Sequence, residues 1–431
     1  MSKSKTLSSV ILWSVISAAF IGPGTVTTAA TAGSLFQLDL LWAVTFATIA
    51  CILLQEVSGR LAIVSGLTMG QALTKKYGQQ TSAWLKFILG GPVILGCAAY
   101  EAGNILGAVS GLNLMTSIDT RILTILITGI SAIILWTGKR DAIGWLMTFL
   151  VGLMGIAFFA LAVNRPFSFL TYFQTAFVPS IPPGSELLTL GLVGTTIVPY
   201  NIFLGSGISK GQTVPLMRVG LTISVLIGGL ITAAILIAGT AVKSFSNFIE
   251  LGHSLTENIG SLGGVALGVG LFAAGFSSAI TSPYAASIIA SSVFAWNNRW
   301  QRIIWALVLL TGFAFGISGI KPIPVILAVQ ALNGLVLPLL TAYLVLLIND
   351  PVIIPSEHRH SPFYNLVLVL IFATVLFMGL TNIDKSVSSW MQLSTGHFGI
   401  MVGATVALTG YLSFKLVALT SKSGKAVQSS S

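Results

Sequence analysis

Two carboxylates inside long apolar segments are the residues of this chain best suited to proton chemistry. Glu56 lies near the end of one segment and Glu101 lies in the middle of another. A carboxylate at membrane depth is costly and marks a functional site by default, although a hydrogen-bonded glutamate that only packs helices is the alternative. We expect Glu101 to load and release the proton.

Glu56 has a cation one helical turn away. Arg60 follows it at i+4, so the two side chains can pair on one helix face near the cytoplasmic boundary. The pair could be a structural ion pair or part of a gate, and the sequence leaves both open. Because Arg60 should hold Glu56 ionised, we assign the proton to Glu101 rather than to Glu56.

Two interruptions in apolar segments predict a binding cavity in the middle of a membrane. The first is FIGPGTVTT at 20–28, where Pro23 removes a backbone donor and Gly22 and Gly24 make non-helical dihedrals cheap. The second is GTTIVPYN at 194–201, five segments later. Freed backbone groups are tolerated in hydrocarbon only where protein or a water-filled cavity satisfies them, and a proline kink in a continuous helix is the alternative. Two such breaks at matching places in two halves indicate an inverted-repeat transporter with a midplane site.

The expected substrate-binding residues lie at the two breaks or are polar at depth in a later span. We expect the breaks to be unwound and to face each other. The predicted set is Gly22, Gly24, Thr25, Thr195, Val198, Tyr200 and Gln330.

The composition places these residues in an all-α polytopic membrane protein. Of 431 residues, 55% are hydrophobic and 7% are charged, with a mean hydropathy of +0.94. We expect about twelve transmembrane helices, each near the length that crosses the hydrocarbon. The expected spans are roughly 10–37 (broken), 40–64, 86–116, 121–137, 142–163, 186–209 (broken), 217–242, 261–294, 301–320, 323–348, 362–381 and 398–418.

Positive charge predicts the orientation of these spans. An even number puts both termini on one side, and only five of the 21 Lys and Arg residues fall on the other: Arg121, Arg165, Lys243, Lys321 and Lys385. Both termini are therefore expected in the cytoplasm, in a multi-pass protein of a bacterial inner membrane. Residues 1–420 form a single transporter domain, and the Ser- and Lys-rich stretch 421–431 is expected to be a disordered cytoplasmic tail.

Several other classes of function lack their sequence signatures. The chain shows no P-loop, H-E-x-x-H, dinucleotide glycine fingerprint or C-x-x-C pair, and no cleavable signal peptide is evident. Cys51 and Cys97 fall inside apolar spans and suit packing rather than a disulfide framework or zinc site. Basic residues are scattered singly, which fits membrane topology rather than nucleic-acid binding. We expect no enzyme activity and no cofactor, and a monomer surrounded by lipid.

Short motifs in a fixed order give the chain a resemblance to a known family. They are GPGT at 22–25, AGS at 32–34, LLW at 40–42, LLQ at 53–55, RLAIVSG at 60–66, Glu101 with Asn104, VPYN at 198–201, AAGFSS at 273–278, and Gln330. In this order they resemble the Nramp family of proton-coupled divalent-metal transporters. The resemblance implies a LeuT-type 5+5 inverted-repeat fold with helices 1 and 6 broken. It places the repeats at about 8–163 and 186–348 and extra helices at about 362–418.

The chain departs from this family where a metal would bind. The metal-ligating Asp of D-P-G-N corresponds to Gly22 and its Asn to Thr25, while the Met and His of M-P-H-N correspond to Val198 and Tyr200. The family's two acids in D-L-A-E correspond to Glu101 and Asn104, which implies a shorter proton relay. Mn²⁺ and Fe²⁺ need carboxylate, amide, imidazole or soft sulfur ligands, and no anion remains at the break. We therefore predict no metal site.

Three functions remain open at this point. The first is an Nramp-like secondary active transporter, proton-coupled, whose substrate is a small neutral or zwitterionic solute rather than a transition metal. The second is a divalent cation transporter for a hydrated ion such as Mg²⁺, with Glu101, Thr25, Thr195 and Gln330 as ligands. The third is a transport-inactive receptor that keeps the fold.

Overall fold

The structure, a computed structural model, describes residues 3–138, 140–163, 165–391 and 397–428, all of them in helices or the segments that join helices. The elements in chain order are α1 (Lys3–Phe20), α2 (Pro23–Phe36), α3 (Leu41–Ser65), α4 (Met69–Asn113), α5 (Thr120–Thr137), α6 (Arg140–Ala162), α7 (Phe169–Phe177), α8 (Glu186–Thr196), α9 (Pro199–Ile208), α10 (Val214–Gly239), α11 (Phe248–Ile259), α12 (Gly263–Ser292), α13 (Asn298–Ile317), α14 (Pro322–Ile348), the 3-10 turn η1 (Ser356–His358), α15 (Pro362–Met391) and α16 (Phe398–Gln428).

The number of membrane-crossing helices agrees with the sequence-based expectation. Within the described residues, ten helices are long and apolar enough to cross a membrane, and the bent pair α1–α2 makes eleven. Helix α14 is a further apolar helix of 27 residues, although the side chains of 324–335 lie outside the described part. The fold is the all-helical, LeuT-type architecture that the sequence predicted.

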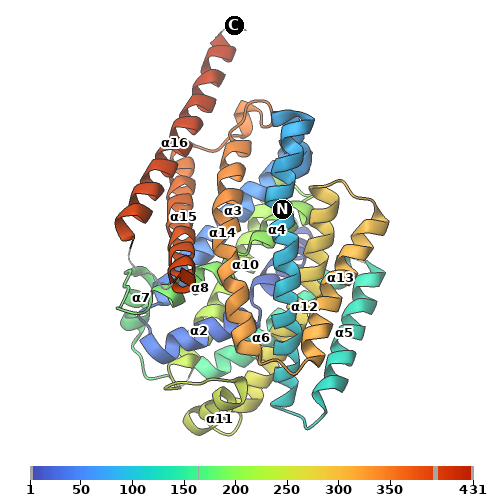
Figure 1. The fold of residues 1–431 in the computed structure, drawn as a ribbon, viewed down its shortest axis with the longest axis vertical. Coiled ribbons are helices and arrows are strands. Elements are labelled where there is room, and N and C mark those ends of the chain that lie inside the picture. Colours follow the sequence, from blue (N-terminus) through green and yellow to red (C-terminus); the bar gives the residue numbers. More distant parts are fainter. Residues whose placement is uncertain (1–2, 139, 164, 392–396, 429–431) are drawn as a thin grey trace.

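Helix α12 lies at the centre of the bundle, in contact with α4, α6 and α13. Small residues let α4 and α12 approach closely, as is common between membrane helices. A Cβ built on Gly275 would lie 2.3 Å from the backbone nitrogen of Ala108, so no larger residue fits there. In Figure 1, α15 and α16 lie at the edge of the bundle opposite α5 and α13.

The first predicted break is present and narrower than expected. Helix α1 ends at Phe20, α2 begins at Pro23, and their axes differ by 63°. Gly22 is extended (φ −98°, ψ −179°), and Pro23 occupies the first turn of α2, where its missing N–H costs nothing. Only Ile21 and Gly22 leave the helix, so Thr25 belongs to the first turn of α2.

The second predicted break is also present, between α8 and α9. Ile197 (φ −96°, ψ 72°) and Val198 (φ −82°, ψ 129°) leave the helix, and Pro199 starts α9. This break is shallower, because the two pieces still cross as one span from Glu186 to Ile208. Each proline lies in the first turn of a helix, and neither lies within a continuous kinked helix.

Three peripheral segments have local structure that the expected spans did not specify. The connector after α3 is helical from Met69 and turns sharply at Gly78 (φ 76°, ψ 171°) before the span proper begins. The segment 165–185 contains a short helix, α7, whose N-terminus is capped by Ser168, which accepts from the Thr171 N–H. Helix α16 continues to Gln428, past Ser421, where the sequence predicted a disordered tail.

Candidate functional site

The two breaks meet around a small internal cavity. Its volume is about 20 Å³, which is room for about one water molecule. All six predicted binding residues at the breaks line this cavity, as does Asn104 of the predicted relay. The lining residues are Ala19, Phe20, Gly22, Gly24, Thr25, Tyr100, Asn104, Thr195, Val198, Tyr200 and Ser278.

Side-chain hydroxyls satisfy the backbone carbonyls at the end of α1. The last carbonyls of a helix have no partner inside the helix, and here the chain turns away after Phe20. The donors come from three other elements. Tyr200 Oη donates to Ala19 O (2.7 Å), Ser277 Oγ and Ser278 Oγ lie 3.2 and 3.3 Å from Ala18 O, and Thr25 Oγ1 donates to Phe20 O.

By contrast, no side chain among the described residues caps the N-termini of α2 and α9 at the two breaks. Gly22 caps α2 and Val198 caps α9, and neither makes a side-chain capping bond. Each N-terminus carries the positive end of a helix dipole. Because residues at the start of both helices line the cavity, the backbone of the site favours a negatively charged group of a ligand.

The cavity lining is otherwise uncharged. It contains hydroxyl groups, one amide, aromatic rings and apolar side chains. Among the described residues, no group of three or more His, Cys, Asp and Glu side chains could hold a metal ion.

Two tyrosines among the lining residues contact each other. The rings of Tyr100, on α4, and Tyr200, on α9, meet edge to face with centroids 5.9 Å apart. Tyr200 is buried and held by its bond to Ala19 O. Sequence reasoning named Tyr200 but missed Tyr100, whose position next to Glu101 in a buried helix was the available signal.

Glu101 lies behind the cavity rather than in its wall. Its side chain is fully buried, and its Oε2 accepts a hydrogen bond from Asn104 Nδ2 (3.2 Å). Its Oε1 has no hydrogen-bond partner among the described residues. Gly312 of α13 packs directly against it, since a Cβ there would lie 2.8 Å from Glu101 Cγ. Asn104 therefore stands between the cavity and the carboxyl group.

Glu56 and Arg60 form the predicted pair, inside a larger cluster than the sequence indicated. Arg60 donates to Glu56 Oε1 through Nε (2.9 Å) and Nη2 (2.8 Å). Arg218 of α10 donates to the same oxygen, while His360 Nε2 (2.8 Å) and the Tyr364 hydroxyl (3.2 Å) contact Oε2. His360 lies in the segment between η1 and α15, and its side chain is buried to 2% exposure.

One predicted site residue cannot be placed. The side chain of Gln330 lies outside the described part of α14. Its place in the site stays a prediction. Ser277 and Ser278, which entered the sequence analysis only as part of the AAGFSS motif, reach the Ala18 carbonyl at the end of α1.

Comparison with known proteins agrees with the family resemblance of the sequence motifs. Residues 14–383 match the family described as natural resistance-associated macrophage protein-like. The chain is 24% identical over 386 residues to the divalent metal cation transporter MntH of Caldanaerobacter subterraneus, covering 84% of this chain and 90% of that protein. It is 26% identical over 297 residues to the natural resistance-associated macrophage protein 2 homolog of Dictyostelium discoideum, covering 64% and 46%.

Solved structures show the same fold. A crystal structure of a manganese transporter mutant from Eremococcus coleocola matches with a TM-score of 0.75 at 18% identity, covering 96% of this chain and 93% of that one. The nucleobase-cation-symport-1 transporter MHP1, in a closed conformation with bromovinylhydantoin bound, matches with a TM-score of 0.55 at 14% identity, covering 95% and 92%. At these identities the likeness concerns the fold.

Proposed function

Because this chain belongs to the Nramp family, we propose that it is a secondary active membrane transporter, coupled to protons, whose substrate is not a transition metal. The observation that carries the proposal is that the backbone carbonyls at the C-terminal end of α1 already accept hydrogen bonds from side chains of the protein. Half-helix carbonyls at a break are the groups that coordinate a cation in transporters of this architecture. Here hydroxyls of the protein itself occupy Ala18, Ala19 and Phe20 carbonyls.

Among the described residues, the cavity lining contains no anionic side chain, which supports the same conclusion. A dehydrated divalent ion needs negative charge nearby to offset the loss of its water. Gly22, Thr25 and Val198 occupy the positions where the resembling motif supplies Asp, Asn and Met, and none carries charge or soft sulfur. We therefore propose that this chain shares its fold, but not its set of metal ligands, with the relatives named as divalent metal or manganese transporters.

The substrate class we propose is a small neutral or zwitterionic solute. The uncapped N-termini of α2 and α9 suit a carboxylate or another anionic group. The uncharged lining suits a ligand without net charge. The 20 Å³ cavity corresponds to a closed state, so binding requires Tyr100 and Tyr200 to move apart or the half-helices to rock.

Proton coupling is assigned to Glu101 with Asn104. The buried carboxyl group has one amide donor and a free oxygen, and no cation forms an ion pair with it among the described residues. Burying an unpaired charge is costly, so a proton that arrives or leaves changes the energy of the closed site. Asn104 transmits this change because it contacts both Glu101 and the cavity.

A hydrated divalent cation such as Mg²⁺ is the second candidate. The unpartnered Glu101 Oε1 favours it, because a carboxylate behind Asn104 could balance part of the charge through water. Thr25 and Thr195 would then supply oxygen ligands. Both hydroxyls donate to backbone carbonyls, of Phe20 and Leu192, and their oxygen lone pairs remain for a cation.

Calorimetry on the purified protein separates these candidates. We would titrate Mn²⁺, Mg²⁺ and a panel of small amino acids, each in separate experiments. We expect heat from at least one zwitterionic solute and none from Mn²⁺ at micromolar concentrations. Micromolar Mn²⁺ binding that Thr25→Ala abolishes would overturn the proposal, and Mg²⁺ binding that needs Glu101 would favour the second candidate.

A further inference from the structure

A groove separate from the transport site opens at the outer edge of the bundle. It lies between α14, α15 and α16 and reaches the first part of α4, with a volume of about 600 Å³. We call it the α14–α16 groove. Its lining residues are Lys76, Tyr77, Pro338, Leu339, Ala342, Tyr343, Leu346, Phe372, Leu376, Gly379, Leu380, Ile383, Leu408, Tyr411, Leu412, Lys415 and Leu419.

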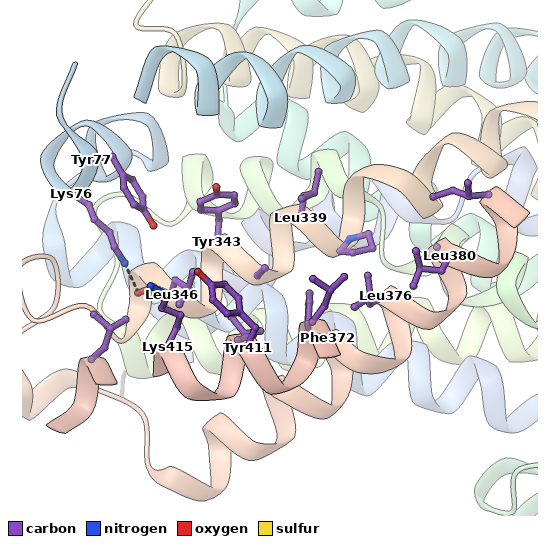
Figure 2. Close-up of a pocket in the computed structure, with 17 residues that line it drawn as sticks. Lys76, Tyr77, Leu339, Tyr343, Leu346, Phe372, Leu376, Leu380, Tyr411 and Lys415 are labelled. Atoms are coloured by element: carbon purple, nitrogen blue, oxygen red, sulfur yellow. Dashed lines mark hydrogen bonds between the residues drawn. The ribbon is translucent and has the colours of Figure 1, made fainter. Parts of the chain in front are cut away.

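The groove has two chemically different ends. Figure 2 shows both lysines and the tyrosines gathered near Leu346, while aliphatic side chains continue toward Leu380. The apolar end rests on a small core of its own, formed by Phe372, Leu376 and Leu412. This arrangement matches an amphiphile that has a polar head and a long apolar tail.

The groove faces the surroundings of the bundle. Helix α16 is the most exposed of the apolar helices, with 11% of its apolar stretch buried. Leu339 and Leu408 line the groove and remain 46% and 47% exposed. In a membrane protein such a surface faces acyl chains, so the occupant must be soluble in hydrocarbon.

The charge at the polar end is unbalanced. Lys76 Nζ pairs with Asp350 Oδ2 (2.9 Å), so its charge is compensated. It also reaches Leu346 O (3.4 Å), as Figure 2 shows. Lys415 is exposed and lies over the Tyr411 ring, 5.4 Å from its centroid, and no carboxylate in the described residues pairs with it. The end therefore keeps one positive charge, beside the Tyr77 and Tyr343 rings.

We propose that the α14–α16 groove binds an anionic phospholipid from the leaflet on the side of Lys415. The phosphate lies between Lys415 and the tyrosine hydroxyls, and one acyl chain follows Leu339 and Leu376 toward Leu380. Basic pockets between membrane helices on the cytoplasmic side bind anionic headgroups, and long lysine side chains reach the interface. A zwitterionic headgroup fits less well, because Asp350 is engaged by Lys76 and no other lining residue is acidic.

Native mass spectrometry of the full chain in detergent tests this assignment. The probes are phosphatidylglycerol and phosphatidylcholine with identical acyl chains. We expect phosphatidylglycerol adducts at lower lipid concentration, and Lys415→Gln should weaken them about fivefold, which corresponds to about 1 kcal/mol for one lysine near the surface. The matched control is Lys210→Gln, an exposed lysine in the turn after α9, which should change nothing.

Two further variants test the apolar end. Ala342→Phe should fill the groove and weaken adducts of both lipids, and Leu408→Trp, at an exposed lining position, serves if the first variant misfolds. The proposal would be overturned if adducts of the two lipids formed at the same lipid concentration. It would also be overturned if Lys415→Gln left the phosphatidylglycerol adducts unchanged. Dimers of the chain in place of lipid adducts would overturn it as well, because the groove would then be an interface between two copies.

Discussion

Replacing Glu56 by Gln should be among the most destabilising conservative changes in this protein. The carboxylate is 6% exposed and accepts from two arginines, while His360 and Tyr364 contact its second oxygen. The amide keeps the shape but removes the charge and turns one oxygen into a donor that faces other donors. Removing one partner of a buried ion pair costs about 3–5 kcal/mol. Because Arg218 is 49% exposed and can turn to water, we expect the lower part of that range, about 3 kcal/mol.

The assay is unfolding of the purified protein in mixed micelles, followed by tryptophan fluorescence. Arg218→Gln should cost roughly 0–1 kcal/mol, because an exposed ion pair is worth little. The matched control is Glu257→Gln, an exposed carboxylate on α11, which should stay within about 0.5 kcal/mol of the parent protein. A loss below about 1 kcal/mol for Glu56→Gln, or an equal loss for Arg218→Gln, would show that the cluster does not stabilise the fold as described.

Three other changes have distinct expected outcomes. Gly107→Ala should cost about 1–3 kcal/mol in the same unfolding assay, since its methyl group would lie 2.2 Å from Pro23 Cγ, whereas Gly96→Ala on the same helix meets nothing within 4 Å and should be neutral. Tyr200→Phe should cost about 1–3 kcal/mol by leaving Ala19 O without its donor; an unchanged stability would mean that water replaces the hydroxyl. Glu101→Gln should bind substrate but lose pH-dependent uptake in proteoliposomes; if it keeps the pH profile while Glu56→Gln loses it, the relay belongs to α3.

The fold was predictable because its signals are local. Proline and glycine within apolar segments predicted both breaks, and each proline lies at the start of a half-helix. The width of the breaks was not predictable, because Pro23 can sit at the first helical position only if α4 leaves room at Gly107. That condition depends on a residue more than eighty positions away, which no local pattern reports.

The long-range polar contacts were the part that sequence could not supply. The i,i+4 pairing of Glu56 with Arg60 was visible, but Arg218 and His360 reach Glu56 from segments distant in sequence. The same holds for Ser277 and Ser278, whose partner Ala18 lies on α1. Small hydroxyl residues in a buried helix are compatible with packing or capping, and only the position of the broken helix decides between them.

The uncharged cavity lining and the hydroxyl groups that cap α1 act on the same part of the site. A broken helix in hydrocarbon leaves carbonyl groups that need a partner, whether a bound cation or the protein itself. Once Tyr200 donates to Ala19 O and Ser278 donates to Ala18 O, the closed site is satisfied without an ion. Introducing a charged side chain alone, such as Gly22→Asp, would therefore place a carboxylate against Ser278 Oγ, 3.0 Å from the new Cβ, while the hydroxyl groups still donate to the carbonyls. We therefore expect a variant to gain a cation site only if the lining residues and the hydroxyl caps are changed together.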